Sequence, residues 1–150
     1  MAFCCIFSCD AIDNLDRIEG MGPIVEEKLA LEDFTGIELD APFRVNLVQG
    51  DTYEVLVEGH QNIIDRLRTK IVNDRLEIGL ANGNYRSFEL EFFITMPELN
   101  FIAIDGAGKL EIDEFTMQEL RCHIDGAGEL NFNAKLDLSL IHISEPTRPY

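Results

Sequence analysis

The pentapeptide Ile-Asp-Gly-Ala-Gly occurs twice in this chain, at residues 104–108 and again at 124–128. A second pair of segments, Thr95–Leu99 and Thr116–Leu120, differs at one position only and lies twenty-one residues apart. Two motifs therefore report one period of about twenty residues. Self-similarity at a fixed period of this length indicates a solenoid, in which each repeat buries its apolar face only against the neighbouring repeats.

Apolar and polar residues alternate within these repeats, which is the pattern of a β-strand and not of a helix. Leu110 and Ile112 lie on one side of such a strand, with Glu111 on the other. Aligned at a shift of twenty, the predicted apolar pairs are Ile102 with Cys122, Ile104 with Ile124, Leu110 with Leu130, and Ile112 with Phe132. Parallel strands ~4.8 Å apart would stack these pairs in the core. Cys122 is then a small core residue and not a nucleophile or a metal ligand.

Each repeat must turn a sharp corner between two strands, and the Gly-Ala-Gly triplets have the composition for it. Glycine adopts positive φ without steric cost, and small residues let successive corners stack closely. An aspartate in front of the triplet can bond the backbone of the turn. The predicted corner residues are Asp105, Gly106, Gly108, Asp125, Gly126 and Gly128.

Strand patterns continue upstream, although the repeat is blurred there. Alternation predicts strands at 43–47, 53–57, 76–78 and 88–92, with turn residues between them. One helix is predicted at 61–68, capped by Asn62 and with Ile63, Ile64 and Leu67 on its apolar face. It would cover an edge or an end of the coil. The chain is therefore predicted to be all-β, as a parallel β-helix with about twenty residues per coil and one short helix.

The N-terminal segment is apolar over its first residues and turns polar after Ser8-Cys9. This resembles the end of a lipoprotein signal peptide, in which a small residue precedes the cysteine that becomes acylated. No Lys or Arg precedes Arg17, whereas a signal peptide starts with a basic region and spans ~15–30 residues. We interpret residues 1–17 as a signal remnant and linker with Cys9 as the lipid attachment site. Met1 then need not be the true start, and a disordered or wrongly assigned N-terminus is the alternative.

The C-terminal segment 138–148, with the sequence LSLIHISEPTR, resembles the translation of a transposase sequencing adapter in one reading frame. We expect residues 138–150 to be read-through from library DNA, so His142 carries no functional argument. The native domain would then cover residues 18–137 and would be truncated at its C-terminus.

The composition excludes several partners. The net charge is −16, and nucleic acids and anionic lipid surfaces instead select clustered Lys and Arg. No apolar run approaches the ~20 residues that a transmembrane helix needs. Cys4, Cys5 and Cys9 crowd together while Cys122 stands alone, which is neither a disulfide framework nor a zinc pattern. We expect no nucleic-acid partner, and a membrane only through the lipid anchor.

No residue set predicts a catalytic, cofactor or metal site. Asp105 stacked on Asp125 would supply two carboxylates, whereas Ca²⁺ takes several oxygen ligands. Glycosidase carboxylates work ~5–9.5 Å apart in a cleft, and nothing in the sequence signals a cleft. We interpret both aspartates as turn formers with solvated side chains, and keep a Ca²⁺ site as the alternative. His60 and His123 have no companion at ligand or triad spacing and are expected at the surface.

Several stretches, taken in order, resemble the bacterial head GIN domain family, also described as auto-transporter adhesin heads. They are EGMGPIVE (19–26), DFTGIEL (33–39), VQGD (48–51), VEG (57–59), NIID (62–65), ITMP (94–97) and the two Gly-Ala-Gly corners. The resemblance implies a right-handed parallel β-helix that is secreted or lipid-anchored in the cell envelope, and it implies no catalytic residues. Asp105 and Asp125 depart from the family pattern, because relatives commonly place Ser or Thr there.

Three function classes remain. We favour a non-enzymatic envelope β-helix, periplasmic or surface-exposed, that binds an unidentified protein or glycan or serves as a scaffold, anchored as an outer-membrane lipoprotein. A polysaccharide-active β-helix enzyme would need more coils and basic residues beside its carboxylates, and the chain has only twelve Lys and Arg. A self-assembling scaffold similar to the bactofilins would reside in the cytosol and carry no lipid signal.

Overall fold

The computed structural model describes residues 17–133 and the backbone of residues 140–144. The strands and the one helix of this part are β1 (Arg17–Glu19), β2 (Ile24–Leu29), β3 (Gly36–Asp40), β4 (Arg44–Gln49), β5 (Glu54–His60), α1 (Gln61–Ile64), β6 (Leu67–Val72), β7 (Arg75–Leu80), β8 (Asn84–Arg86), β9 (Leu90–Met96), β10 (Phe101–Gly106), β11 (Lys109–Asp113), β12 (Glu119–Gly126), β13 (Glu129–Phe132) and β14 (Leu140–Ser144). For these described residues, the prediction of an all-β fold with one short helix is confirmed.

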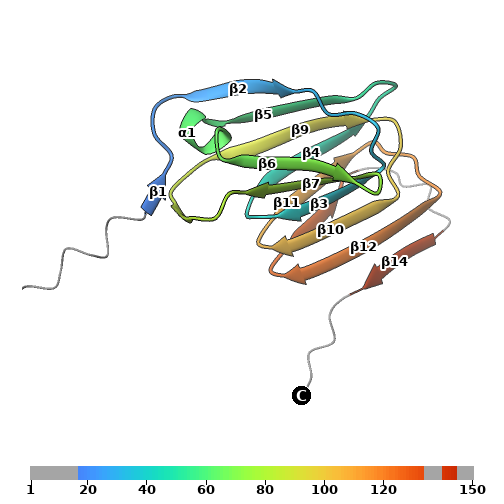
Figure 1. The fold of residues 1–150 in the computed structure, drawn as a ribbon. Helices are drawn as coiled ribbons and strands as arrows, with labels where there is room; N and C mark the ends of the chain where they lie inside the picture. The colour runs from blue at the N-terminus through green and yellow to red at the C-terminus, as the bar shows by residue number, and fades with distance from the viewer. Residues whose placement is uncertain (1–16, 134–139, 145–150) are drawn as a thin grey trace, which may run out of the picture.

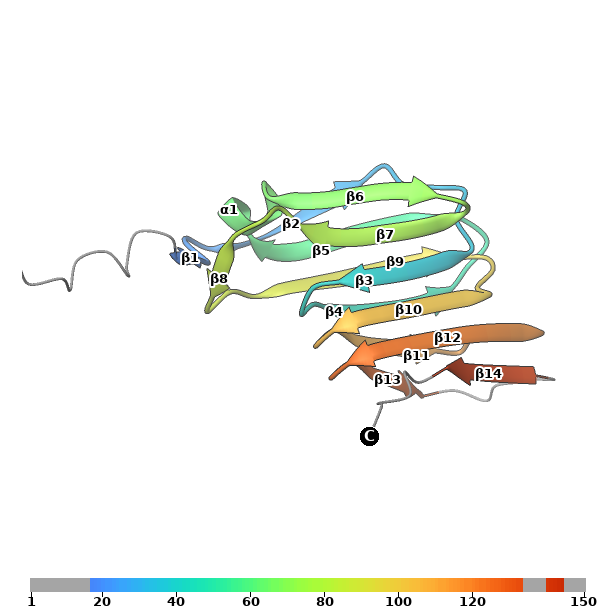
Figure 2. The ribbon, with the colours of Figure 1, turned by 60° about the horizontal axis from the view of Figure 1, so that its bottom comes forward.

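Two six-stranded sheets form the body of the molecule (Figure 1). The first, here called the β3 sheet, has the strand order β14-β12-β10-β3-β7-β6, which Figure 2 shows as one stack. The second, the β4 sheet, has the order β13-β11-β4-β9-β5-β2. A small parallel pair, β1 with β8, lies at one end. At each Gly-Ala-Gly corner the chain passes from the β3 sheet to the β4 sheet: β10 is followed by β11, and β12 is followed by β13.

One apolar core lies between the two sheets, because alternate residues of each strand point inward. Its largest fully buried aromatic side chains are Phe34, Phe43, Phe92 and Phe115. No polar or charged side chain is buried in the described part of the chain. The core side chains are therefore apolar, and every charged side chain of the described residues is at least partly exposed to solvent.

The predicted apolar pairs are confirmed in the register of the parallel strands. Ile102 lies opposite Cys122 and Ile104 opposite Ile124 in the β10–β12 pair. Leu110 lies opposite Leu130 and Ile112 opposite Phe132 in the β11–β13 pair. The predicted core position of Cys122 is also correct, because its side chain is only 3% exposed.

The sheets are mixed, and they do not form regular parallel coils throughout the domain. Strand β5 runs antiparallel to β2 and β9, and β6 runs antiparallel to β7. The reversal between β6 and β7 occurs at Asn73 and Asp74, whose φ angles of 51° and 61° suit a two-residue hairpin turn. Strand β3 pairs with both β7 and β10. Strands β3 and β10 are therefore neighbours in the sheet, although the segment from β5 to β9 lies between them in the sequence.

The predicted helix over 61–68 is wrong in extent and in its cap. Helix α1 ends at Ile64, and Leu67 begins strand β6 because that segment pairs along its length with β7. The N-cap is His60, and Asn62 uses its side chain elsewhere: Nδ2 donates to the Glu19 carbonyl and Oδ1 accepts from the Met21 amide. Asn62 thereby ties the N-terminal segment to the domain.

Two predictions concern segments near the ends. Cys9 lies outside the described residues, as does most of the segment 1–17. Residues 140–144 form β14, parallel to β12. An open edge strand offers unpaired N–H and C=O groups to any extended segment. The pairing of β14 with β12 therefore does not show whether residues 140–144 belong to the native protein. The interpretation of 138–150 as adapter read-through, and of 18–137 as the native domain, stays a prediction.

Candidate binding face

The two Gly-Ala-Gly corners stack directly on each other. The Ala127 amide donates to the Gly106 carbonyl over 3.0 Å, and the Glu129 amide donates to the Gly108 carbonyl over 2.9 Å. Gly106 and Gly126 have the predicted positive φ, at 96° and 92°. Gly128 is required for a different reason, because there is no room for a side chain: a Cβ on it would lie 2.6 Å from Cγ2 of Ile104. Each triplet thus combines one glycine needed for conformation with one needed for packing.

Asp105 and Asp125 lie opposite each other in the β10–β12 register, and both side chains are exposed. Within the described residues neither carboxylate makes a hydrogen bond or an ion pair, so the expected bond to the turn backbone is not made. The same part of the chain holds no group of three or more His, Cys, Asp or Glu side chains that could coordinate a metal ion. The corner aspartates are solvated side chains in this structure.

A groove of about 490 Å³ opens beside these corners, on the outer face of the β4 sheet. Ala107 of the first corner lies at its rim. Its walls combine apolar and charged side chains from five separate segments of the chain, among them Ile24, Arg44, Phe88, Glu89, Glu91 and Lys109. The groove is therefore built by tertiary structure and could not be recognised from any one motif.

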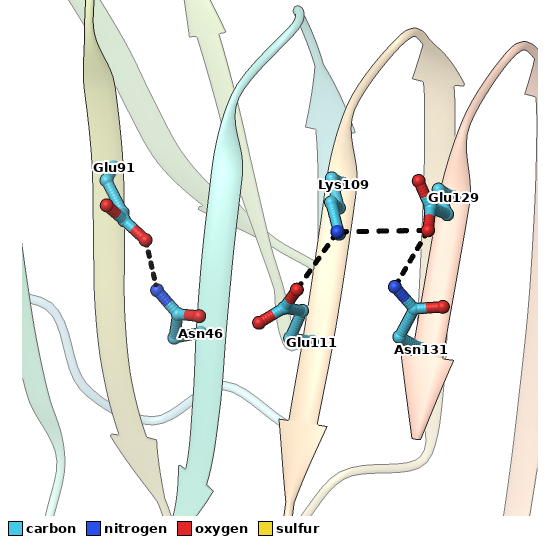
Figure 3. Close-up of polar contacts among 6 residues, drawn as sticks. All are labelled: Asn46, Glu91, Lys109, Glu111, Glu129 and Asn131. Carbon is cyan, nitrogen blue, oxygen red and sulfur yellow. Dashed lines mark hydrogen bonds and ion pairs between the residues drawn. The ribbon is translucent and has the colours of Figure 1, made fainter. Parts of the chain in front are cut away.

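Two separate groups of polar contacts, together called the polar network, continue from the groove across four strands of this face (Figure 3). Asn46 on β4 donates to Glu91 on β9 over 2.7 Å, and Asn131 donates to Glu129 within β13 over 2.8 Å. Lys109 on β11 lies 3.1 Å from Glu111 and 3.8 Å from Glu129. Three glutamates thus pair with one lysine and two asparagines, and these contacts hold the side chains in place.

Phe93 lies within this face, opposite Asn46 on β4 and Leu56 on β5. It is 36% exposed, although phenylalanines on strands are expected in the core. The sequence does contain a signal for this exposure: Phe92 and Phe93 are adjacent on a strand, so one of them must point outward. Val48, 44% exposed on the neighbouring strand, adds apolar surface. We define Phe93, Val48, the polar network and the groove as the candidate binding face.

The remaining candidate residues are not part of any site. His123 is exposed on β12 as predicted, and the Nδ1 atom of His60 lies 3.1 Å from the Gly22 carbonyl oxygen. Burial raises the pKa of the Cys122 thiol to about 11, so this side chain stays protonated and unreactive near neutral pH. Among the described residues no helix is long and apolar enough to cross a membrane.

The fold is similar to that of several solved structures. A putative adhesin from Bacteroides fragilis superposes with a TM-score of 0.74 at 19% identity, covering 85% of this chain and 61% of that one. A putative lipid binding protein from Parabacteroides distasonis superposes with a TM-score of 0.71, also at 19% identity, covering 87% and 65%. The chain thus spans less than two thirds of either structure. Neither description names an enzyme.

No curated protein matches the sequence. A family model described as "Putative auto-transporter adhesin, head GIN domain" matches residues 33–145. This range contains both glycine corners and most of the candidate binding face. Since the match covers well over half of the 150 residues, the chain belongs to the head GIN domain family.

Proposed function

We propose that this chain is a non-enzymatic binding module of adhesin type, displayed at the cell envelope, which contacts a protein or glycan through the candidate binding face. The family description and the adhesin-like relatives support an adhesive role. The observation that carries the choice of face is the exposed Phe93, which lies within an ordered polar network beside a groove. Aromatic side chains with such surroundings commonly supply most of the energy of an interface.

The polar network favours binding because its side chains are already ordered, which lowers the entropic cost of fixing them in a complex. A rotamer-rich side chain that becomes fixed on binding costs roughly 0.5–1.5 kcal/mol. Here Asn46, Lys109 and Asn131 are already fixed by partners on the same face. Arg44 points outward between Glu91 and Lys109 in the strand register, and within the described residues it has no ion-pair partner. Its guanidinium is available to a ligand acceptor.

Replacing Phe93 with alanine is expected to weaken ligand binding at least tenfold without unfolding the domain, because the side chain is partly exposed and lies outside the core. The measurement is binding of the purified 150-residue chain to immobilised panels of glycans and extracellular-matrix proteins, followed by titration of any ligand found.

The matched control is Ile71→Ala, which removes a similarly exposed apolar side chain from β6 of the other sheet; Ile71 lines neither the groove nor the cavity beside Arg75. It should leave the dissociation constant within about twofold, since surface substitutions away from an interface have small effects. An equal loss in both variants, or no binding to either panel, would contradict the assignment of this face.

We further propose that Cys9 carries a lipid that anchors the domain to the envelope. The apolar segment ending in Ser8-Cys9 supports this. Cells expressing the chain behind a complete signal peptide and fed a clickable fatty acid should label the wild type, while Cys9→Ala should lose the label and leave the membrane fraction. Cys5→Ala is the matched control. Equal labelling of Cys9→Ala and wild type would exclude Cys9 as the attachment site.

We also propose that β3–β4, β10–β11 and β12–β13 are successive coils of a right-handed parallel β-helix. The parallel register supports this, since Phe101 lies opposite both Gly36 and Arg121, and Lys109 lies opposite both Arg44 and Glu129. Such stacking would carry the candidate binding face from coil to coil.

A further inference from the structure

A second cavity, of about 310 Å³, lies on the outer face of the opposite sheet, the β3 sheet. Its lining consists of Arg75, Phe101 and Arg121, the polar side chains of Thr35, Asn73 and Asn100, and the carboxylates of Asp74 and Glu119. This volume is at the lower end of the ~300–1,000 Å³ that small-molecule sites occupy. The cavity shares no residue with the groove of the candidate binding face, so it is a separate feature of the molecule.

The strand register places an unusual row of side chains across this cavity. From β6 to β12 the row reads Val72, Arg75, Gly36, Phe101 and Arg121. It holds two guanidinium groups and no carboxylate, in a chain with 28 Asp and Glu and a net charge of −16. The neighbouring row contains Glu77 and Glu38. Asp74 and Glu119 line the cavity beside this row, and Glu119 pairs with Arg121, so Arg75 is the guanidinium of the lining that has no ion-pair partner among the described residues.

Because Gly36 has no side chain, the side chains of Arg75 and Phe101 on either side of it come into contact. A Cβ on Gly36 would lie 3.0 Å from Cγ of Arg75 and 3.1 Å from Cβ of Phe101. Without it, the Arg75 guanidinium stacks over the Phe101 ring, 3.6 Å from the ring centroid. Within the described residues Arg75 forms no ion pair or hydrogen bond, so stacking fixes its orientation while its N–H groups stay available.

Backbone hydrogen bonds hold the floor of the cavity in place. The Gly36 amide donates to the Asp74 carbonyl over 3.0 Å, and the Asn100 amide donates to the Thr35 carbonyl over 2.9 Å. The Arg121 amide then donates to the Asn100 carbonyl over 3.0 Å. These bonds link four segments that are distant in sequence, so the lining is preorganised and a ligand need not order it.

We propose that this cavity binds a uronic acid residue of an acidic glycan. Arginine matches a carboxylate with two parallel N–H···O bonds, which a neutral sugar cannot accept in the same way. Thr35, Asn73 and Asn100 offer donors and acceptors to ring hydroxyls, and Phe101 offers apolar surface to the C–H groups of a pyranose. Glu119 already engages Arg121 through Nε over 3.1 Å, which makes Arg75 the principal carboxylate ligand.

The test is NMR titration of the isotopically labelled 150-residue chain with methyl β-D-glucuronide, and separately with the neutral methyl β-D-glucoside. We expect the glucuronide alone to shift the amide signals of Gly36, Asn100 and Arg121 with a millimolar dissociation constant. Binding should weaken as salt is raised, since the charges are near the surface. Arg75→Gln should weaken it at least tenfold, and Arg75→Lys should bind with intermediate affinity because it keeps the charge and loses the bidentate geometry.

Arg44→Gln is the matched control, because it removes an unpaired arginine from the candidate binding face and should leave glucuronide affinity unchanged. Phe93→Ala should likewise leave the glucuronide titration unaffected. Loss of partner binding in Phe93→Ala and loss of glucuronide binding in Arg75→Gln therefore test the two proposals separately. Equal shifts with the neutral glucoside would overturn the proposal, as would full affinity in Arg75→Gln. Displacement by inorganic phosphate at equal concentration would show a general anion site and would also overturn the assignment to a sugar acid.

Discussion

Replacing Gly126 with alanine is expected to lower the free energy of unfolding by about 3 kcal/mol, through strain and crowding together. The φ angle of Gly126 is +92°, which residues with a Cβ rarely adopt. The new Cβ would also lie 3.1 Å from the Gly106 carbonyl oxygen and 3.3 Å from the Gly106 Cα. Both atoms belong to the backbone of the corner below and cannot move without disturbing it. Urea denaturation followed by circular dichroism measures the effect.

Gly106→Ala is the matched control for the stacking part of this effect. Gly106 has nearly the same φ, +96°, but a Cβ there would meet nothing within 4 Å. We expect this variant to lose only the conformational part, about 1–2 kcal/mol. The difference between the two variants measures how tightly the corners stack. Equal losses would show that the close approach of Gly126 to Gly106 contributes nothing to stability.

The corners could be predicted from sequence because the information in them is local and repeated. The pairing of Ile104 with Ile124 follows from one alignment of the chain with itself, and a shift by one residue would bring polar residues into the core. The inserted part between β4 and β10 has no such copy. Its residues Leu67 and Arg68 read as the end of a helix until the pairing of β6 with β7 is known, and that pairing depends on the turn at Asn73 and Asp74. Tertiary pairing there overrides local propensity.

The candidate sites were less predictable than the fold, because each depends on neighbours from distant strands. The exposure of Phe93 depends on which of two adjacent phenylalanines faces the core. Arg75 and Phe101 meet only because both strands flank Gly36, and nothing in the sequence near any of the three indicates it. For the corner aspartates, the sequence motif suggested more interactions than the structure contains. Asp105 and Asp125 stand in a repeated motif, yet in the structure they are solvated and make no hydrogen bond or ion pair among the described residues.

Replacing Phe92 with alanine is expected to cost about 4 kcal/mol of unfolding free energy, within the range measured for buried phenylalanines. Its side chain is fully buried and its ring packs edge to face against Phe43, with 5.6 Å between the centroids. Because small domains are stable by only ~5–15 kcal/mol, this one change would remove much of the margin. We expect a large fall in the urea midpoint with little change in the slope, measured as for the corner variants.

Phe93→Ala provides the control within the same strand, since it removes the same atoms from the next residue. Phe93 points away from the core and is 36% exposed, so the loss of unfolding free energy should be below about 1 kcal/mol. The two variants should therefore separate stability from binding: Phe92→Ala unfolds the domain easily, and Phe93→Ala keeps the fold and loses the ligand. A large stability loss in Phe93→Ala would show that its ring supports the sheet, and its place in the candidate binding face would then need other evidence.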